Sequence, residues 1–142
     1  MIRKVMHAPE VMSEPTAYAR PVPFSRGIRV DSGEAVFLFI SGTASVDKKG
    51  NSLYPGDFAA QATRTYKNIT ALLSSEGADW DDVVRTTCYL SDMRHYEDFR
   101  KFRIEFYRKQ GITKLPASTC VEAALCRPEF LVEVEAIAVL RK

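Results

Sequence analysis

The sequence predicts an α+β fold in which two helices cover one face of a mixed sheet. Residues 58–76 and 95–109 carry apolar side chains at spacings of three and four, which is typical of amphipathic helices. Short apolar or alternating runs, bounded by Gly, Pro, Asp and Ser, flank these segments and indicate strands. The predicted order is β-β-α-β-α-β-β, and a chain of 142 residues is expected to form a single domain over residues 1–142.

The first elements are an irregular N-terminal segment and a hairpin. Residues 1–17 are expected to be irregular because prolines interrupt them and few apolar residues recur. Strands over residues 27–30 and 35–40 then flank the turn sequence of residues 31–34. The second strand ends in Ser41-Gly42-Thr43, small residues that let a ligand come close to the backbone.

A capping signal opens the first predicted helix. Asp57 precedes this helix and can accept a hydrogen bond from a free N–H of the first turn, while Gly77 ends it. The strand predicted over residues 83–90 follows. Alternation places one set of its side chains on the same face: Val84, Thr86, Cys88 and Leu90.

The last part of the chain predicts a helix and two strands. The second helix ends at Gly111, and strands over residues 117–125 and 131–140 are joined by the turn Arg127-Pro128-Glu129. Several of the predicted strands are apolar on both sides, whereas the two helices can cover only one face of the sheet. Association between copies of the chain would bury the second face.

The overall charge argues against a nucleic-acid partner. The chain has 20 Lys and Arg against 18 Asp and Glu, whereas nucleic-acid-binding domains carry a clustered basic surface. Basic residues gather in residues 100–109, but Glu97, Asp98 and Glu105 are interspersed with them, so a solvated helix face and a functional patch both stay open. With two histidines in all, the sequence also lacks the pattern for RNA cleavage by a histidine pair.

No segment predicts a membrane span, a signal peptide or a metal site. No run approaches the roughly 20 apolar residues that a spanning helix needs, and residues 1–9 have no apolar region after their basic residues. The three cysteines Cys88, Cys120 and Cys126 lack metal-ligand spacing, and reduced, buried thiols in a cytoplasmic protein are expected. No cofactor is expected either.

Several short motifs occur together in the order and spacing of a known family. They are Pro23-Phe24-Ser25-Arg26-Gly27, Ile40-Ser41-Gly42, Asp57 with Gln61 and Asn68, Asp82-Val83-Val84-Arg85, Tyr89-Leu90-Ser91-Asp92-Met93, Tyr96 with Phe99, and Leu115-Pro116-Ala117-Ser118-Thr119-Cys120-Val121-Glu122 followed by residues 131–138. This pattern resembles the Rid/YjgF family, small proteins whose best-known members hydrolyse reactive enamines and imines. The resemblance covers residues 23–138.

The resemblance implies a chorismate-mutase-like fold and a barrel-like homotrimer with three ligand pockets, each between neighbouring subunits. The segments that match the pocket are Phe24–Gly27, Ser41–Thr43, Ser118–Cys120 and Glu133. In imine-hydrolysing relatives, an arginine after the Pro-Ala pair holds a substrate carboxylate bidentately, a role that a hydroxyl cannot copy. Here that position is Ser118, and the position of the family's tyrosine is Phe24.

These matches define the candidate site residues. Glu133 and Arg26 are the candidate catalytic residues. Glu133 could act as an acid/base or orient water, and Arg26 could either replace the missing guanidinium or be a surface arginine on an edge strand. The candidate substrate-binding residues are Phe24, Ser25, Ser41, Gly42, Thr43, Ser118, Thr119 and Cys120, the last through its backbone N–H.

Three functions remain open on this basis. The first is binding or transformation of a small metabolite, a carboxylic acid, without imine deaminase activity, because Ser118 replaces the arginine. The second is an enamine/imine deaminase, a hydrolase, in which Arg26 is the substitute anchor. The third is a non-catalytic binding or regulatory trimer. A weaker resemblance to the Rid-like half of chorismatases, carried by Phe24–Arg26, Ser41–Ser45 and residues 126–133, points to a cyclic or aromatic acid as the ligand.

Overall fold

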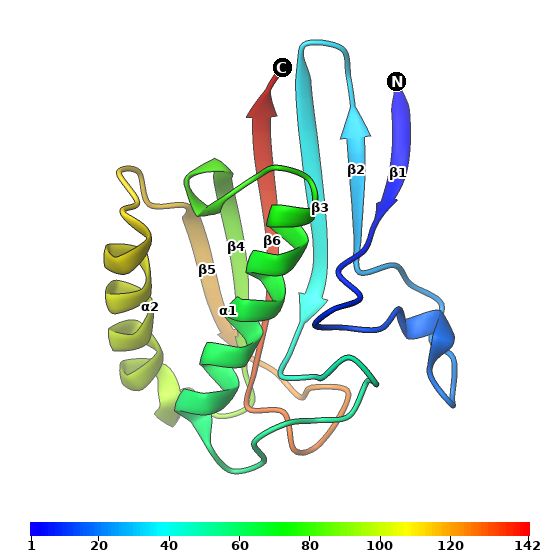
Figure 1. Ribbon diagram of the computed structural model, residues 1–142. Coiled ribbons are helices and arrows are strands. Elements are labelled where there is room, and N and C mark those ends of the chain that lie inside the picture. Colours follow the sequence, from blue (N-terminus) through cyan, green and yellow to red (C-terminus); the bar gives the residue numbers. More distant parts are fainter.

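Two helices pack on one face of a six-stranded sheet (Figure 1). The computed structural model describes all 142 residues. The elements are Ile2–Met6 (β1), Gly27–Asp31 (β2), Ala35–Thr43 (β3), Phe58–Ser75 (α1), Val83–Leu90 (β4), Tyr96–Gln110 (α2), Ala117–Glu122 (β5) and Val132–Arg141 (β6). The strand order is β1-β2-β3-β6-β4-β5, and all neighbours are antiparallel except the parallel pair β4 and β5. The predicted α+β fold with two helices on a mixed sheet is confirmed.

The N-terminal segment is not irregular throughout, so the prediction for residues 1–17 is wrong in part. Residues Ile2–Met6 form β1, an edge strand that pairs antiparallel with β2. Met6 is its one buried side chain and packs on Gly27, where an added Cβ would lie 2.9 Å from the Met6 sulfur. Backbone hydrogen bonds to β2 hold the other residues of β1. Their side chains are not buried, so the sequence shows no apolar pattern that predicts this strand.

Strand β4 also departs from simple alternation. Val84 is 48% exposed, whereas Val83, Thr86 and Cys88 are buried, so the predicted face is right from Thr86 onward and wrong at Val84. The pairing of β4 with β6 shifts register between Val83 and Arg85. Such a bulge adds one residue to a strand, and here it turns Val84 away from the core.

An aromatic cluster joins the two helices above the sheet. Tyr66 of α1 stacks on Trp80 with ring centroids 5.0 Å apart, and Phe106 of α2 meets both rings edge-on. Stacked and edge-on pairs of this kind stabilise a core beyond the area that they bury. The cluster fixes α2 in place although α2 buries only Phe99 and Tyr107 of its own residues.

Both helices end where the sequence predicts. The Asp57 carboxylate accepts a hydrogen bond from the Ala60 N–H at 3.0 Å and caps α1. Gly77 and Gly111 follow α1 and α2 with φ values of +74° and +68°, the left-handed conformation that glycine adopts without strain. Neither helix combines the length and the apolar character that a membrane crossing requires.

No helix covers the opposite face of the sheet, as Figure 1 shows, and part of that face is apolar. Ile28 of β2 lies opposite Phe39 of β3, which in turn lies opposite Ile137 of β6. Val30 and Phe37 form the next such pair. Residues directly opposite in a sheet share a face, so these side chains form one patch, in which Phe39 is 44% exposed.

A buried glutamine on α1 holds the loops at one end of the sheet. Gln61 Nε2 donates to the backbone carbonyls of Tyr54 at 3.1 Å and Glu129 at 2.9 Å. Its Oε1 accepts from the Leu131 N–H at 2.9 Å. One amide side chain therefore ties α1 both to the loop before it and to the segment that leads into β6.

A second buried amide acts two helical turns later. Asn68 Nδ2 donates to the backbone carbonyls of Ala44 at 3.1 Å and Val46 at 3.0 Å. Both acceptors lie in the segment that follows β3. The two amides thus anchor the connections after β3 and before β6 to the same helix.

We predict that Gln61→Leu lowers the free energy of unfolding by about 3 kcal/mol, because three hydrogen bonds to the backbone are lost, each of which contributes about 1 kcal/mol. Denaturant unfolding at a fixed protein concentration measures the loss. Lys67→Leu, at an exposed position of the same helix, is the matched control and stays within about 0.5 kcal/mol of the wild type. Equal unfolding midpoints for the two variants would contradict the proposed role of Gln61.

Candidate functional site

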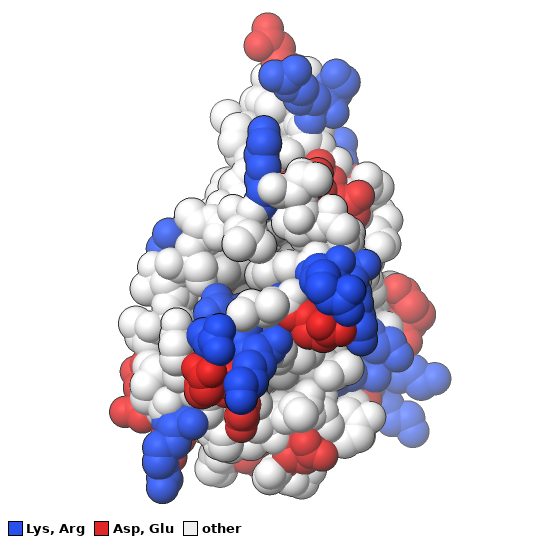
Figure 2. Space-filling model, turned by 90° about the vertical axis from the view of Figure 1, so that its left-hand side faces the viewer, with Lys and Arg blue, Asp and Glu red and all other residues white.

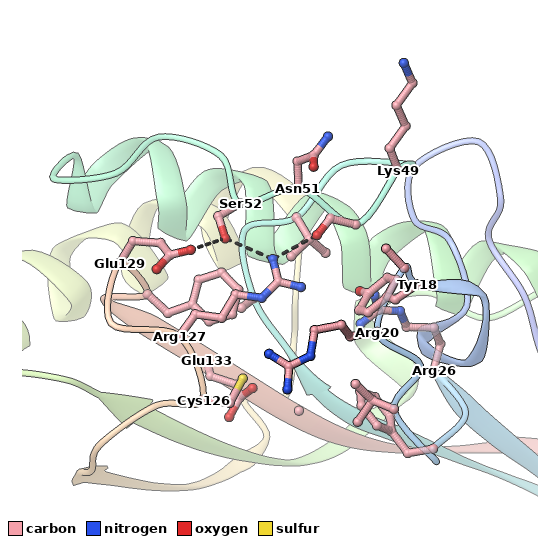
Figure 3. A pocket seen from close by; sticks show the side chains of 18 of the residues that line it. Tyr18, Arg20, Arg26, Lys49, Asn51, Ser52, Cys126, Arg127, Glu129 and Glu133 are labelled. Atoms are coloured by element: carbon pink, nitrogen blue, oxygen red, sulfur yellow. Dashed lines mark hydrogen bonds between the residues drawn. The ribbon is translucent and has the colours of Figure 1, made fainter.

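A cavity of about 950 Å³ lies at the end of the sheet where the two anchored connections meet (Figure 3). Three segments line the cavity, taken from residues 18–26 before β2, residues 42–52 after the bulge of β3, and residues 126–133 at the start of β6. Four of the predicted site residues line it: Phe24, Arg26, Gly42 and Glu133.

Glu133 is a half-buried carboxylate that forms neither a hydrogen bond nor an ion pair with the protein. It lies on β6, and its carboxyl group rests over the backbone of Gly42, where an added Cβ would be 3.0 Å from the carboxyl carbon. Gly42 is therefore the residue that leaves room for this side chain. Burial, and next the negative charge of Glu135, raise the pKa of Glu133.

The other carboxylate of the cavity is shifted in the opposite direction. Glu129 accepts a hydrogen bond from the Ser52 hydroxyl at 2.6 Å. This hydrogen bond is the main reason why the pKa of Glu129 is lowered. One cavity thus holds one carboxylate with a lowered pKa and another with a raised pKa, a combination typical of sites with distinct acid and base groups.

Arg26 is buried, with 4% of its surface exposed, so it is not the surface arginine that was one of the two expectations. Its Nε donates to the Ser13 carbonyl at 3.1 Å, and its Nη2 donates to the Tyr18 hydroxyl. The guanidinium also lies 5.9 Å from the centre of the Phe24 ring. The N-terminal segment therefore fixes Arg26 at the cavity wall and occupies several of its donors.

Arg127 is a second guanidinium at the cavity, and sequence reasoning did not select it. It donates to the Gly50 carbonyl at 2.8 Å and to the Ser52 hydroxyl at 3.0 Å, and Figure 3 shows these bonds together with the bond from Ser52 to Glu129. Its guanidinium carbon lies 5.6 Å from the centre of the Tyr18 ring. The weaker chorismatase resemblance, which runs through residues 126–133, was the one signal for it.

Tyr18 and Arg20 were also missed as cavity residues. Both lie outside regular secondary structure, in a part of the chain where no periodicity indicates which side chains point inward. Tyr18 brings a phenolic hydroxyl to the cavity whose wall Phe24 also forms. Arg20 adds a guanidinium that forms no ion pair. Three arginines, Arg20, Arg26 and Arg127, therefore line the cavity with two glutamates, Glu129 and Glu133.

Ser25, Ser41 and Thr43 were also predicted to bind substrate, and they shape the backbone beside the cavity. Ser41 Oγ donates to the Ser25 carbonyl at 2.7 Å and joins β3 to the segment before β2. Thr43 is fully buried, and its hydroxyl donates to the Ser41 carbonyl at 2.8 Å across the bulge. These three residues hold Gly42 in position rather than line the cavity themselves.

The predicted substrate-binding residues of β5 lie away from the cavity. Ser118, Thr119 and Cys120 belong to β5, the edge strand that β4 and β6 separate from β3. Ser118 accepts a hydrogen bond from Arg103, and Thr119 accepts one from Arg85. Within one chain these residues do not reach the Glu133 cavity.

The cysteines are less uniform than expected. Cys88 is buried and Cys120 is half-buried, and burial raises the pKa of both thiols. Cys126 is exposed and lines the cavity, so the prediction that all three thiols are buried is wrong there. The reason is that Cys126 falls after the end of β5, in an irregular connection, rather than in a strand.

We predict a pH-dependent stabilisation by Glu133→Gln. Because the folded protein keeps the Glu133 proton to a higher pH than the unfolded chain, wild-type stability falls as the pH rises from 4.5 through the raised folded pKa. Glutamine removes that fall, so the difference in melting temperature in favour of the variant grows from pH 4 to pH 8. Glu34→Gln in the exposed hairpin turn is the control, and parallel wild-type and Glu133→Gln profiles would refute the assignment.

Comparisons with known proteins agree with this fold. The family model described as Endoribonuclease L-PSP matches residues 14–140. A RutC family protein of Pyrococcus abyssi is 33% identical over 116 residues, which are 82% of this chain and 85% of the relative. Protein DfrA of Myxococcus xanthus is 33% identical over 139 residues, which are 98% of this chain and 97% of the relative.

Solved structures of Escherichia coli proteins are similar over nearly their full length. The YjgF gene product has 30% sequence identity and a TM-score of 0.71, covering 92% of this chain and 98% of its own. TdcF, solved with bound serine, has 25% identity and a TM-score of 0.77, covering 96% of this chain and 98% of its own. With the matched family model and the shared topology, these likenesses show that the chain belongs to the Rid/YjgF family, also described as endoribonuclease L-PSP.

Proposed function

We propose that this protein is a homotrimer that binds a small carboxylic acid in pockets between neighbouring subunits. The observation that carries the proposal is the unpaired carboxylate of Glu133 in a cavity whose walls hold Arg20, Arg26 and Arg127. An arginine-rich cavity favours an anionic ligand, and a half-buried, proton-retaining carboxylate can face the ligand's other end.

Two features support a pocket that needs two subunits. The apolar face around Phe39 is open to solvent in one chain, as expected of a surface that a second copy covers. The β5 residues that match the family pocket lie at the opposite edge of the sheet from β2 and β3. A neighbouring subunit can bring its β5 edge to the Glu133 cavity, which one chain cannot do alone.

Glu133 is the group that would act on the bound acid. In its protonated form it can donate a proton, and in its ionised form it can orient a water molecule. The raised pKa makes both forms accessible closer to neutral pH. If the bound acid is unreactive, the pocket is a binding site only, and the protein is then a non-catalytic binding trimer.

Hydrolysis of imines is the second candidate function. Ser118 and Phe24 stand where the resemblance places an arginine and a tyrosine, and this argues against the activity. Tyr18 argues for it, because its hydroxyl reaches the same cavity from another part of the chain. TdcF has been solved with bound serine, a small molecule that carries a carboxylate, the group proposed here for the ligand.

RNA cleavage is not proposed although the family model's description names it. Neither histidine lines the Glu133 cavity. His7 bonds to Glu14, and His95 stacks on Phe58 with ring centroids 4.6 Å apart.

The free cysteines fit the further proposal that the protein works in the reducing cytoplasm.

We expect no acceleration of 2-aminoacrylate hydrolysis, because Phe24 offers no hydroxyl where the resemblance places a tyrosine. Pyruvate formation from 2-aminoacrylate generated in situ measures the rate with and without the protein. A rate well above the uncatalysed one would favour the deaminase. In that event Arg26→Gln tests the substitute anchor, with Arg3→Gln on the edge strand β1, outside the cavity lining, as the control.

The homotrimer is tested on the open face of the sheet. Light scattering of the wild type is expected to give three times the chain mass of 16.0 kDa at micromolar concentration. Phe39→Glu places a charge in the apolar patch and is expected to dissociate the assembly. Tyr96→Glu on the helix side, where the side chain is 40% exposed, leaves the mass unchanged. A 16.0 kDa wild-type species would contradict the trimer.

A further inference from the structure

A second cleft, of about 580 Å³, lies between α2 and β5, away from the Glu133 cavity. Its walls combine three arginines of α2, Arg100, Arg103 and Arg108, with apolar side chains and with Ser118 of β5. Figure 2 shows the side of the molecule that carries α2 and β5, where Lys and Arg side chains gather with Asp and Glu among them.

Two of the three arginines are neutralised by carboxylates of their own helix. Arg100 forms a bidentate pair with Glu97, with a shortest distance of 2.6 Å. Arg108 forms the same arrangement with Glu105 at 2.7 Å. Their positive charge is already balanced, so neither is a ready site for a further anion.

Arg103 differs because none of its partners is a carboxylate. Its Nη1 donates to the Ser118 hydroxyl at 3.0 Å and contacts the Cys88 sulfur at 3.9 Å. Burial raises the pKa of the Cys88 thiol, so this neighbour stays neutral. The Nε and Nη2 groups donate to no protein acceptor, and the half-buried guanidinium keeps its full charge and free donors.

The surroundings of Arg103 suit one kind of ligand. The guanidinium carbon lies 4.6 Å from the centre of the Phe99 ring, a cation–π contact that holds the side chain against α2. A planar guanidinium with two free donor groups matches a carboxylate. The side chains of Ile104, Ile112 and Leu115 supply an apolar wall for the rest of the ligand.

We infer that Arg103 is the carboxylate anchor of the proposed ligand, delivered from α2 and held in place by the hydroxyl of Ser118. The inference rests on the proposed function for the existence of a carboxylate ligand. Ser118 has a specific part in it, because its hydroxyl accepts a hydrogen bond from the Arg103 guanidinium at 3.0 Å. Ser118 stands where the resemblance places an arginine, and Arg103 of α2 brings a guanidinium to that place.

The test is titration calorimetry of the intact protein with benzoate and with benzamide, which share a shape and differ in charge. The wild type is expected to bind benzoate and not benzamide. Arg103→Gln is expected to weaken benzoate binding about tenfold or more. Arg103→Lys keeps the charge without the planar fork and retains part of the affinity. Lys101→Gln, at an exposed position of the same helix outside the cleft lining, is the matched control with unchanged affinity.

The outcomes separate the inference from the function on which it rests. Benzoate binding that is equal in the wild type and in Arg103→Gln overturns Arg103 as the anchor and leaves the proposed acid-binding function standing. No benzoate binding by the wild type overturns the acid-binding function and the anchor together. Equal loss in Lys101→Gln and Arg103→Gln overturns the anchor as well, because it shows that only the general positive charge of α2 matters. Melting curves of each variant confirm that it is folded.

Discussion

The hydrogen bonds of Gln61 are the constraint on which the candidate site depends most. Loops that carry ligand-binding residues contribute few apolar contacts, so something else must fix them. Here a buried amide of α1 bonds to the backbone of the loop before α1 and of the segment that leads into β6, and Asn68 bonds in the same way to the segment after β3. The rigid helix thereby determines where Glu133 and Arg127 stand relative to each other.

The sheet divides the candidate site into two halves. Glu133, with arginines that are largely held by backbone carbonyls and hydroxyls, lies at the β3 and β6 end. Arg103, with its free donors, lies at the β5 edge. A subunit interface that joins the two halves would set a free cation opposite a free carboxylate, and a ligand with a carboxylate at one end fits between them.

The sequence allowed the layered architecture to be predicted, because the periodicity of α1 and α2 and the apolar runs of the central strands reflect burial. It did not allow β1 to be predicted, since backbone pairing holds that strand and only Met6 is buried. Glu133 and Gly42 could be found from the family pattern. Tyr18 and Arg20 could not, because nothing in an irregular segment shows which side chains reach a cavity.

Arg103 illustrates a further limit of sequence reasoning. In the sequence it stands in a charged run that suggests a solvated helix face, and it becomes distinct only when its neighbours are seen paired with Glu97 and Glu105.

The most direct test of the whole account is a crystal structure of the assembled protein with benzoate bound. The account predicts a benzoate carboxylate on Arg103 of one subunit, in a pocket that Glu133 of the neighbouring subunit also lines. An assembly in which Arg103 and Glu133 face no common pocket would contradict it.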